Sequence, residues 1–283
     1  MKLQWTRPHR PDWTRLRPAD LAHVVRDAIP ARNTIRSEWT KLRSVRSTWI
    51  LALTAIVAGV GLSVLGMSDL LSTPASQVPP DWDPTAGSLK GFLFAQLVIG
   101  MLGAFSITPE YASGMIGGSL AMVPSRSRLL VAKTLVVGAI ALVVSLFTTL
   151  ISFTVVQLSV KGAGLPAAGL GDPGVLGALV GATLYLTFVA LIGVAVGVLT
   201  RSSTSSLAVL VGALLLVPAL APGLPGAIGD AFGRYWPITA GQAAYTVVPV
   251  GGMVSPGSGL FILLVATVVV TVVSHSAFRT RDV

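Results

Sequence analysis

Residues 134–158 read TLVVGAIALVVSLFTTLISFTVVQL, and residues 175–199 read VLGALVGATLYLTFVALIGVAVGVL. Neither stretch contains a charged residue, and each exceeds the roughly 20 apolar residues with which an α-helix crosses the hydrocarbon core of a bilayer. A soluble protein needs polar and charged side chains on its surface. The two stretches therefore predict membrane-spanning helices and decide the fold class.

The rest of the chain has the same character. Hydrophobic residues make up 53% of the sequence and charged residues 11%, with a mean hydropathy of +0.78, whereas soluble domains carry about 25% charged residues. Four further uncharged windows are long enough to be spans: 49–67, 91–107, 207–224 and 257–278. We therefore expect an all-α, polytopic membrane protein with about six transmembrane helices. Pro218 and Pro222 in the fifth window leave a broken helix or a five-span count open.

Basic residues are distributed unevenly around these windows. With a cytoplasmic N-terminus, all 20 Lys and Arg residues except Lys90, Lys161 and Arg234 fall on cytoplasmic segments. The positive-inside rule then places both the N- and the C-terminus in the cytoplasm. The net charge of +9 is spread along membrane boundaries, which argues against a nucleic-acid partner.

Residues 1–33 are rich in Arg and Pro and are expected to form a cytoplasmic arm ahead of the membrane domain, residues 34–283. The arm is either a loosely ordered tail or a segment whose tryptophans and arginines bind anionic lipid headgroups.

An amphipathic elbow helix is predicted over residues 34–48, before the first span. Its apolar residues recur at helical spacing, and its basic residues mostly lie off that stripe, as expected for a helix on the surface of the bilayer. Glu38 falls on the apolar stripe. Its carboxylate is expected either to meet another part of a protein or to pair with Lys41, three residues further on.

The connection over residues 108–133 is longer than a simple turn requires. Thr108, Pro109 and Glu110 combine a hydroxyl cap, a proline and an acid, all typical of a helix start. The predicted helix continues to Val123 and loosens at Gly117–Gly118. A helix outside the bilayer suggests a docking surface for a partner.

Three segments of this chain resemble the permeases of type-two ATP-binding-cassette (ABC) exporters, in their actinobacterial form. They are EWTKLRS at 38–44, the series Glu110-Tyr111, Gly114, Leu120, Pro124, Arg126, Arg128 and Lys133, and YWPITAGQ at 235–242. Many relatives have Thr after the glycine and a basic residue two places later, where this chain has Met115 and Gly117, so the contact is expected to differ in detail.

The resemblance implies a coupling helix in the 108–133 connection that docks on a partner ATPase. It also implies two ABC ATPase subunits, a second permease copy or a homologous permease, and a location in the bacterial cytoplasmic membrane. ATP and Mg would be held by the ATPase, with no cofactor in this chain. The implied ATPase contacts are Glu110, Tyr111, Gly114, Met115, Arg126, Arg128, Glu38 and Lys41.

Two other features of the sequence bear on a substrate path. The outer segment over residues 221–256 is rich in Gly and Pro, and part of it is a candidate re-entrant element that dips into the outer leaflet, as the resemblance implies. Uncharged polar residues inside the spans are candidates for an amphiphile path, namely Gln96, Thr149, Gln157 and Tyr185. The alternative is that they hydrogen bond helix to helix, while Gly193 and Gly197 allow close helix packing.

Several kinds of chemistry are absent from the sequence. There is no cysteine, no glycine-rich phosphate loop, and no metal-type spacing of His9, His23 and His275. No predicted span contains a carboxylate, the usual coupling group of ion-driven carriers. These absences argue against an enzyme and an ion-driven carrier, and the resemblance implies the favoured function, the permease subunit of an ATP-driven exporter. A stand-alone carrier or channel and a non-transporting membrane scaffold remain the alternatives.

Overall fold

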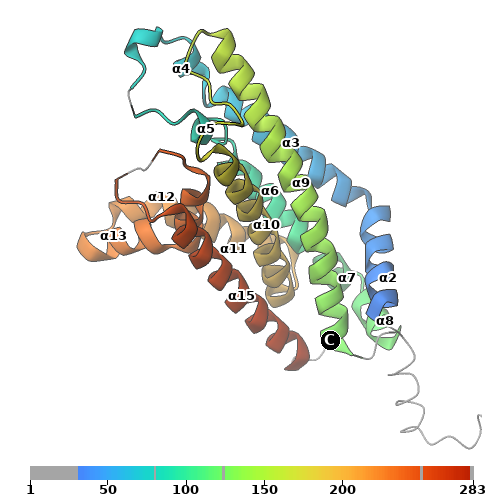
Figure 1. Ribbon diagram of the computed structural model, residues 1–283. Coiled ribbons are helices and arrows are strands. Elements are labelled where there is room, and N and C mark those ends of the chain that lie inside the picture. Colours follow the sequence, from blue (N-terminus) through green and yellow to red (C-terminus); the bar gives the residue numbers. More distant parts are fainter. Residues whose placement is uncertain (1–30, 80, 123–124, 249–250, 281–283) are drawn as a thin grey trace, which may run out of the picture.

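The structure is a computed structural model that describes residues 31–79, 81–122, 125–248 and 251–280. The predicted arm over residues 1–33 therefore lies almost entirely outside the described residues. Helices form most of the described chain, which contains no strand (Figure 1). Five of these helices are long and apolar enough to cross a membrane: α3 (Arg46–Leu65), α9 (Arg126–Gly162), α10 (Val175–Thr200), Ser203–Gly223 and α15 (Pro256–Thr280). The all-α polytopic membrane fold is confirmed.

The window at 91–107 forms a shorter helix, α6 (Phe92–Phe105), with 14 residues. Helix α6 packs against both α3 and α10, and side chains such as Ile99 are fully buried. It is therefore part of the bundle, although it is shorter than the roughly 20 residues of a usual span. Six spans remain a prediction.

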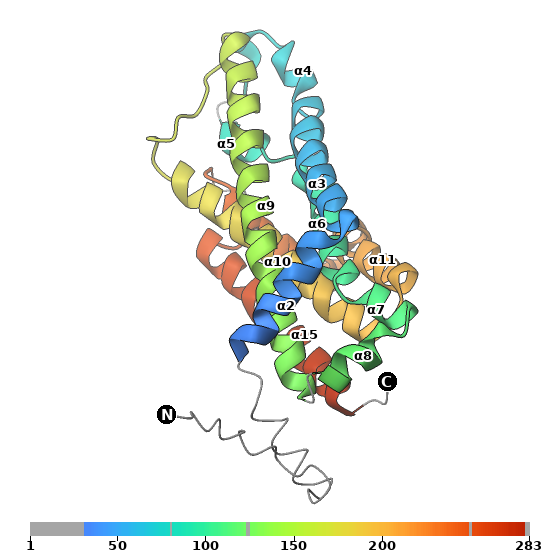
Figure 2. The same ribbon diagram turned by 90° about the vertical axis from the view of Figure 1, so that its right-hand side faces the viewer.

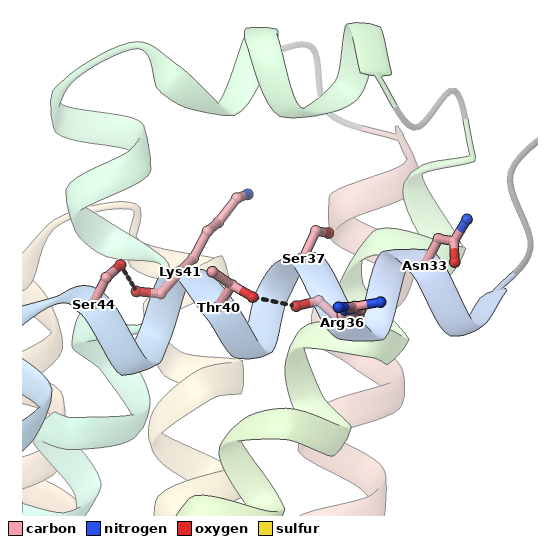
Figure 3. Close-up of a pocket in the computed structure, with 6 residues that line it drawn as sticks. All are labelled: Asn33, Arg36, Ser37, Thr40, Lys41 and Ser44. Atoms are coloured by element: carbon pink, nitrogen blue, oxygen red, sulfur yellow. Dashed lines mark hydrogen bonds between the residues drawn. The ribbon is translucent and has the colours of Figure 1, made fainter.

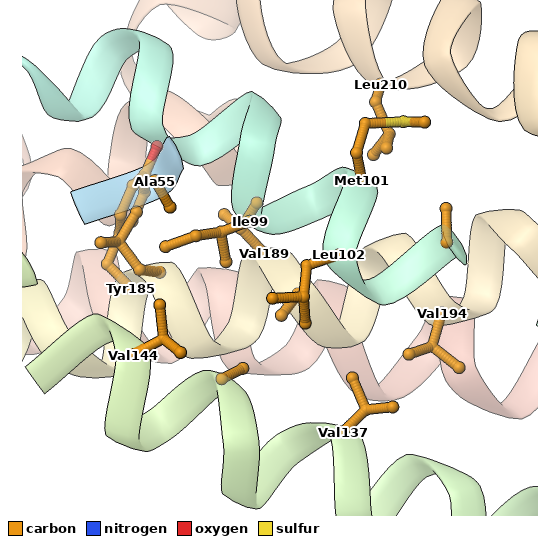
Figure 4. Packing of buried hydrophobic residues seen from close by; sticks show 14 of the residues in the cluster. Ala55, Ile99, Met101, Leu102, Val137, Val144, Tyr185, Val189, Val194 and Leu210 are labelled. Atoms are coloured by element: carbon orange, nitrogen blue, oxygen red, sulfur yellow. The ribbon is translucent and has the colours of Figure 1, made fainter. Parts of the chain in front are cut away.

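Helix α10 lies between α6, α9 and α15 and provides much of the core (Figure 4). A Cβ atom added at Gly193 would lie 2.0 Å from the carbonyl oxygen of Gly100, and one at Gly103 would lie 2.0 Å from that of Ala190. The backbones of α6 and α10 are therefore in direct contact. The predicted role of Gly193 and Gly197 in close helix packing is confirmed.

The two ends of the bundle carry different elements (Figures 1 and 2). At one end lie α2 (Ala31–Ser44), α7 (Thr108–Ala112), α8 (Met115–Met122) and the last turns of α15. At the other end lie the short helices α4 (Ser68–Leu71) and α5 (Pro84–Gly87). We call the first the inner end, because the distribution of basic residues predicts that it faces the cytoplasm, and the second the outer end.

The elbow helix ends earlier than predicted. Helix α2 ends at Ser44, Val45 adopts an extended conformation (φ −83°, ψ 118°), and α3 begins at Arg46. The Trp49 indole Nε1 donates a hydrogen bond of 2.8 Å to the carbonyl oxygen of Arg43 across this corner. Residues 46–48 therefore belong to the first span, and the predicted limit of 34–48 is wrong at its end.

The inner connection is also divided differently from the prediction. Instead of one helix that loosens at Gly117–Gly118, there are two helices, α7 and α8, separated at Ser113 and Gly114. Gly114 has a φ of +69°, in the left-handed region that glycine adopts at no steric cost. The chain therefore turns sharply at Gly114.

Most of the outer segment at 221–256 is helical. It contains a 3₁₀ turn (Ala221–Gly223), α13 (Gly226–Tyr235), α14 (Pro237–Gln242) and a second 3₁₀ turn, η5 (Ala243–Tyr245). Helix α14 packs on α15. Whether this segment enters the bilayer remains a prediction.

One polar side chain, that of Asp83, joins two outer connections to one another. One Asp83 carboxylate oxygen accepts hydrogen bonds from the amides of Thr85 and Ala86, and the other accepts from the amides of Val247 (2.6 Å) and Val248 (2.9 Å). The outer end is thus held together by contacts between residues that are distant in sequence.

Candidate functional site

Three inner elements, α2, α7 and α9, meet at a buried lysine. The Lys133 Nζ lies 2.7 Å from Glu38 Oε2, 2.7 Å from Glu110 Oε1 and 3.0 Å from the carbonyl oxygen of Ser106. An ammonium group has three N–H donors, so each donor of Lys133 has an acceptor within reach. This one side chain therefore connects the elbow helix, the inner connection and the third predicted span.

Lys41 completes the arrangement, and we call Glu38, Lys41, Glu110 and Lys133 the inner ion cluster. The Lys41 Nζ lies 2.7 Å from Glu38 Oε1 and 3.7 Å from Glu110 Oε1. The two positive and two negative charges sum to zero. Side-chain exposure is 1% for both Glu38 and Lys133, 12% for Glu110 and 38% for Lys41, so the cluster reaches solvent mainly at Lys41.

The surroundings of Glu38 and Lys41 favour the charged forms of both side chains. Burial by itself would raise the pKa of Glu38, but the charges and hydrogen bonds of Lys133 and Lys41 outweigh it and lower that pKa. Burial by itself would lower the pKa of Lys41, but Glu38 and Glu110 outweigh it and raise that pKa. Among the described residues there is no group of three or more His, Cys, Asp or Glu that could hold a metal ion. The cluster is therefore an ion-pair network.

Helix α7 also contacts the connection between α10 and the fifth span. The guanidinium of Arg201 lies 5.3 Å from the centre of the Tyr111 ring, and the hydroxyls of Thr108 and Ser203 are 2.8 Å apart. Burial, which is the largest influence, raises the pKa of Tyr111. Residues 108–111 thus contact the elbow and α9 on one side, and the α10 connection on the other.

The residues predicted to touch an ATPase differ in how exposed they are. Gly114 and Met115 are exposed, with Met115 at 57%. Tyr111, Arg126, Arg128 and Lys41 are half-buried, and Arg126 donates a hydrogen bond to the carbonyl oxygen of Phe278. Glu38 and Glu110 lie in the inner ion cluster, and Glu38 is too buried to meet a partner directly in this conformation. Contact with an ATPase remains a prediction for this set.

A groove of about 600 Å³ runs along α2 and is lined by Asn33, Arg36, Ser37, Thr40, Lys41 and Ser44. Figure 3 shows the Lys41 side chain extending away from α2 into this space. A second pocket of about 360 Å³ has Lys41, Glu110, Met115 and Lys133 among its lining residues. The inner ion cluster therefore lies beside cavities between the elbow and the inner connection.

Sequence reasoning missed the central residue of this site. The sequence predicts no contact for Lys133, which is only the last basic residue of the 110–133 series that resembles the exporter permeases. The signal that could have identified it is the stripe of apolar residues around it, Leu129, Leu130, Val136 and Val137, which are all buried. A lysine among these positions points into the bundle, as Glu38 does on its own apolar stripe. The predicted protein contact of Glu38 is confirmed, and so is its pair with Lys41.

The candidate path residues are buried and hydrogen bonded. The Tyr185 hydroxyl donates to Gln96 Oε1, and Thr183 donates to Thr149 over 3.4 Å. The Gln157 amide nitrogen donates to Pro84 and Ser88, and its oxygen accepts from Ala168. In this conformation these residues hold elements of the bundle together, and a role in lining a substrate path remains a prediction.

Comparison with known proteins gives one family. The sequence profile of a family described as "ABC-2 family transporter protein" matches residues 34–218, which is well over half of the chain. No curated protein matches the sequence significantly. The matched range contains the whole inner ion cluster and both helices of the inner connection.

Proposed function

Because the chain belongs to the ABC-2 transporter family, we propose that it exports an amphiphilic or hydrophobic substrate using ATP hydrolysed by a separate subunit. A permease of this family is a multi-pass, non-catalytic membrane subunit that associates with ABC ATPases. The proposed assembly has two ATPase subunits, which hold ATP and Mg, and two permease subunits. It would lie in the bacterial cytoplasmic membrane.

The observation that best supports this proposal is the position of α7 between the two sides of the bundle. The exposed turn at Gly114 and Met115 would receive the ATPase. Displacing that turn moves α7, and with it Glu110, Thr108 and Tyr111. Glu110 acts on α2 and α9 through the inner ion cluster, whereas Thr108 and Tyr111 act on the connection that follows α10.

Energetics favour movement of the inner ion cluster as a unit. Pulling Glu110 away from Lys133 would break one of the two buried ion pairs of this lysine, and removing a partner from a buried pair typically costs about 3–5 kcal/mol. A rigid displacement keeps each 2.7 Å contact and avoids that cost. A displacement of α7 would therefore also displace α9 and α2. The ATPase can drive this change only if it binds the protein differently before and after the displacement.

The test is reconstitution with the ATPase encoded in a neighbouring reading frame. The complex should copurify, and its ATP hydrolysis should be stimulated by some members of an amphiphile panel. Met115→Arg should release the ATPase while the protein remains folded in the membrane. As a control, Ala163→Arg places the same charge at an exposed position directly after the other end of α9. Transport by the purified chain without any ATPase would refute the proposal.

A further inference from the structure

The fifth apolar helix, Ser203–Gly223, changes its hydrogen-bond pattern in the middle. It begins as α11 (Ser203–Val211), passes through a π-helical turn (Gly212–Leu216) and continues as α12 (Val217–Leu220). In the π turn the amide of Val217 donates to Gly212, five residues earlier, instead of to Ala213. One residue further on, Pro218 has no amide hydrogen with which to serve Leu214.

Two consecutive carbonyl groups, those of Ala213 and Leu214, therefore lose the donors that a regular α-helix would supply. Each is served by a side chain from another element. The Trp236 indole Nε1 donates to Ala213 over 2.8 Å, and the Gln96 amide nitrogen donates to Leu214 over 3.3 Å. Neighbouring side chains and local π turns are the means by which membrane helices tolerate proline.

These two donors belong to different parts of the molecule, one to the bundle core and one to the outer helices. Gln96 belongs to α6, is fully buried, and accepts a hydrogen bond from Tyr185 of α10. Trp236 lies at the junction of α13 and α14, where the backbone leaves the helical conformation (φ −57°, ψ 128°), and its ring stacks on Phe232 with centroids 5.6 Å apart. The π turn is therefore attached to the bundle core and also to the outer helices.

We propose that Gly212–Leu216 is a hinge, and that Gln96 and Trp236 are positioning residues that hold it in its present conformation. Segment 217–223 and α13 would move together when these two hydrogen bonds break. Bare carbonyl groups are costly in an apolar environment, so water or a polar part of a cargo must replace the donors. The hinge would then open only when the path beside it is hydrated or occupied.

A role for this hinge as an outer gate rests on the proposed export function, but the hinge itself does not. Hydrogen–deuterium exchange of the full-length protein in lipid nanodiscs, without ATPase or substrate, tests the hinge alone. Trp236→Phe removes the indole donor and keeps an aromatic ring. It should raise exchange over residues 212–223 by about 10-fold, as expected for the loss of one hydrogen bond, and leave α9 unchanged.

Two further variants make the test independent of a single substitution. Pro218→Ala restores an amide that can serve Leu214, so exchange over the same residues should fall. Gln96→Leu should raise it, as Trp236→Phe does. The control is Tyr235→Phe, which removes one polar atom from the neighbouring, 54% exposed residue and should have no effect.

Unchanged exchange in both Trp236→Phe and Gln96→Leu would overturn the hinge, and so would faster exchange in Pro218→Ala. Export is measured separately in proteoliposomes with the ATPase. Altered exchange with normal export would refute the gate and leave the hinge standing. Absence of export from the wild-type complex would refute the proposed function without bearing on the exchange result.

Discussion

Replacing Lys133 with Met should test whether the inner ion cluster acts through charge. Methionine resembles lysine in length and is apolar, so packing around α9 is largely kept. The substitution removes two ion pairs of 2.7 Å and the 3.0 Å bond to Ser106. It leaves Glu38 and Glu110 to share Lys41, which is 38% exposed.

The size of the effect follows from burial. Removing one partner of a buried ion pair typically costs about 3–5 kcal/mol, and 1 kcal/mol corresponds to roughly 2–4 °C in a protein of this size class. The unfolding temperature of Lys133→Met should therefore fall by on the order of 10 °C. Lys161→Met, an exposed change near the other end of the same helix, should alter the unfolding temperature by less than about 2 °C.

Thermal unfolding followed by tryptophan fluorescence in nanodiscs provides the measurement. The double variant Glu38→Leu with Lys133→Met should recover part of the loss, because it replaces both members of one buried pair by apolar residues and leaves Lys41 for Glu110. If Lys133→Met matches wild type, the cluster does not stabilise the fold. If the double variant is as unstable as the single one, the loss comes from packing, and the electrostatic account is wrong.

Three other predictions concern the same protein. Because the pKa of Glu38 is lowered, its contribution to stability is present above pH 4.5 and is lost as the pH falls through the lowered value. Because the pKa of Lys41 is raised, its contribution to stability is present below pH 10.5 and is lost as the pH rises through the raised value. The contribution of these two groups to the unfolding temperature should accordingly be flat between about pH 5 and pH 10, and Glu38→Gln should abolish the part of the acid loss that is due to this carboxylate. Met115→Arg should abolish ATPase copurification and leave the unfolding temperature within about 2 °C of wild type, since surface changes are usually small; retention of the ATPase would argue against docking at this turn. Gly193→Ala should cost about 1–3 kcal/mol in unfolding experiments by overpacking α6 against α10, whereas Gly177→Ala, where nothing lies within 4 Å of the added carbon, should be close to neutral.

Long-range composition and local geometry differ in how far they can be predicted from this sequence. A charge-free stretch such as 134–158 has few alternatives to a membrane helix, so the fold class followed directly. The corner at Val45 could not be located, because the helical spacing of apolar residues continues across it. The turn at Gly114 was placed too late, since Gly117–Gly118 offered the stronger glycine signal.

The inner ion cluster shows a second limit. Periodicity indicates which face of a helix a residue occupies, and in this way Glu38 was expected to meet a protein group. It does not indicate which group is met, and Lys133 lies 95 positions further along the chain. The broken helix that Pro218 and Pro222 left open is not found, because a π turn and donors from Gln96 and Trp236 keep the helix continuous.

Helix α9 runs without interruption for 37 residues and carries Lys133 near one end and Gln157 near the other. At about 1.5 Å per residue these two side chains are separated by roughly 36 Å along a single rod. A tilt of about 5° pivoting at Lys133 would sweep Gln157 sideways by roughly 3 Å. That distance is about the length of one hydrogen bond. A small tilt at the inner end is therefore enough to break the hydrogen bonds of Gln157 with Pro84, Ser88 and Ala168 at the outer end.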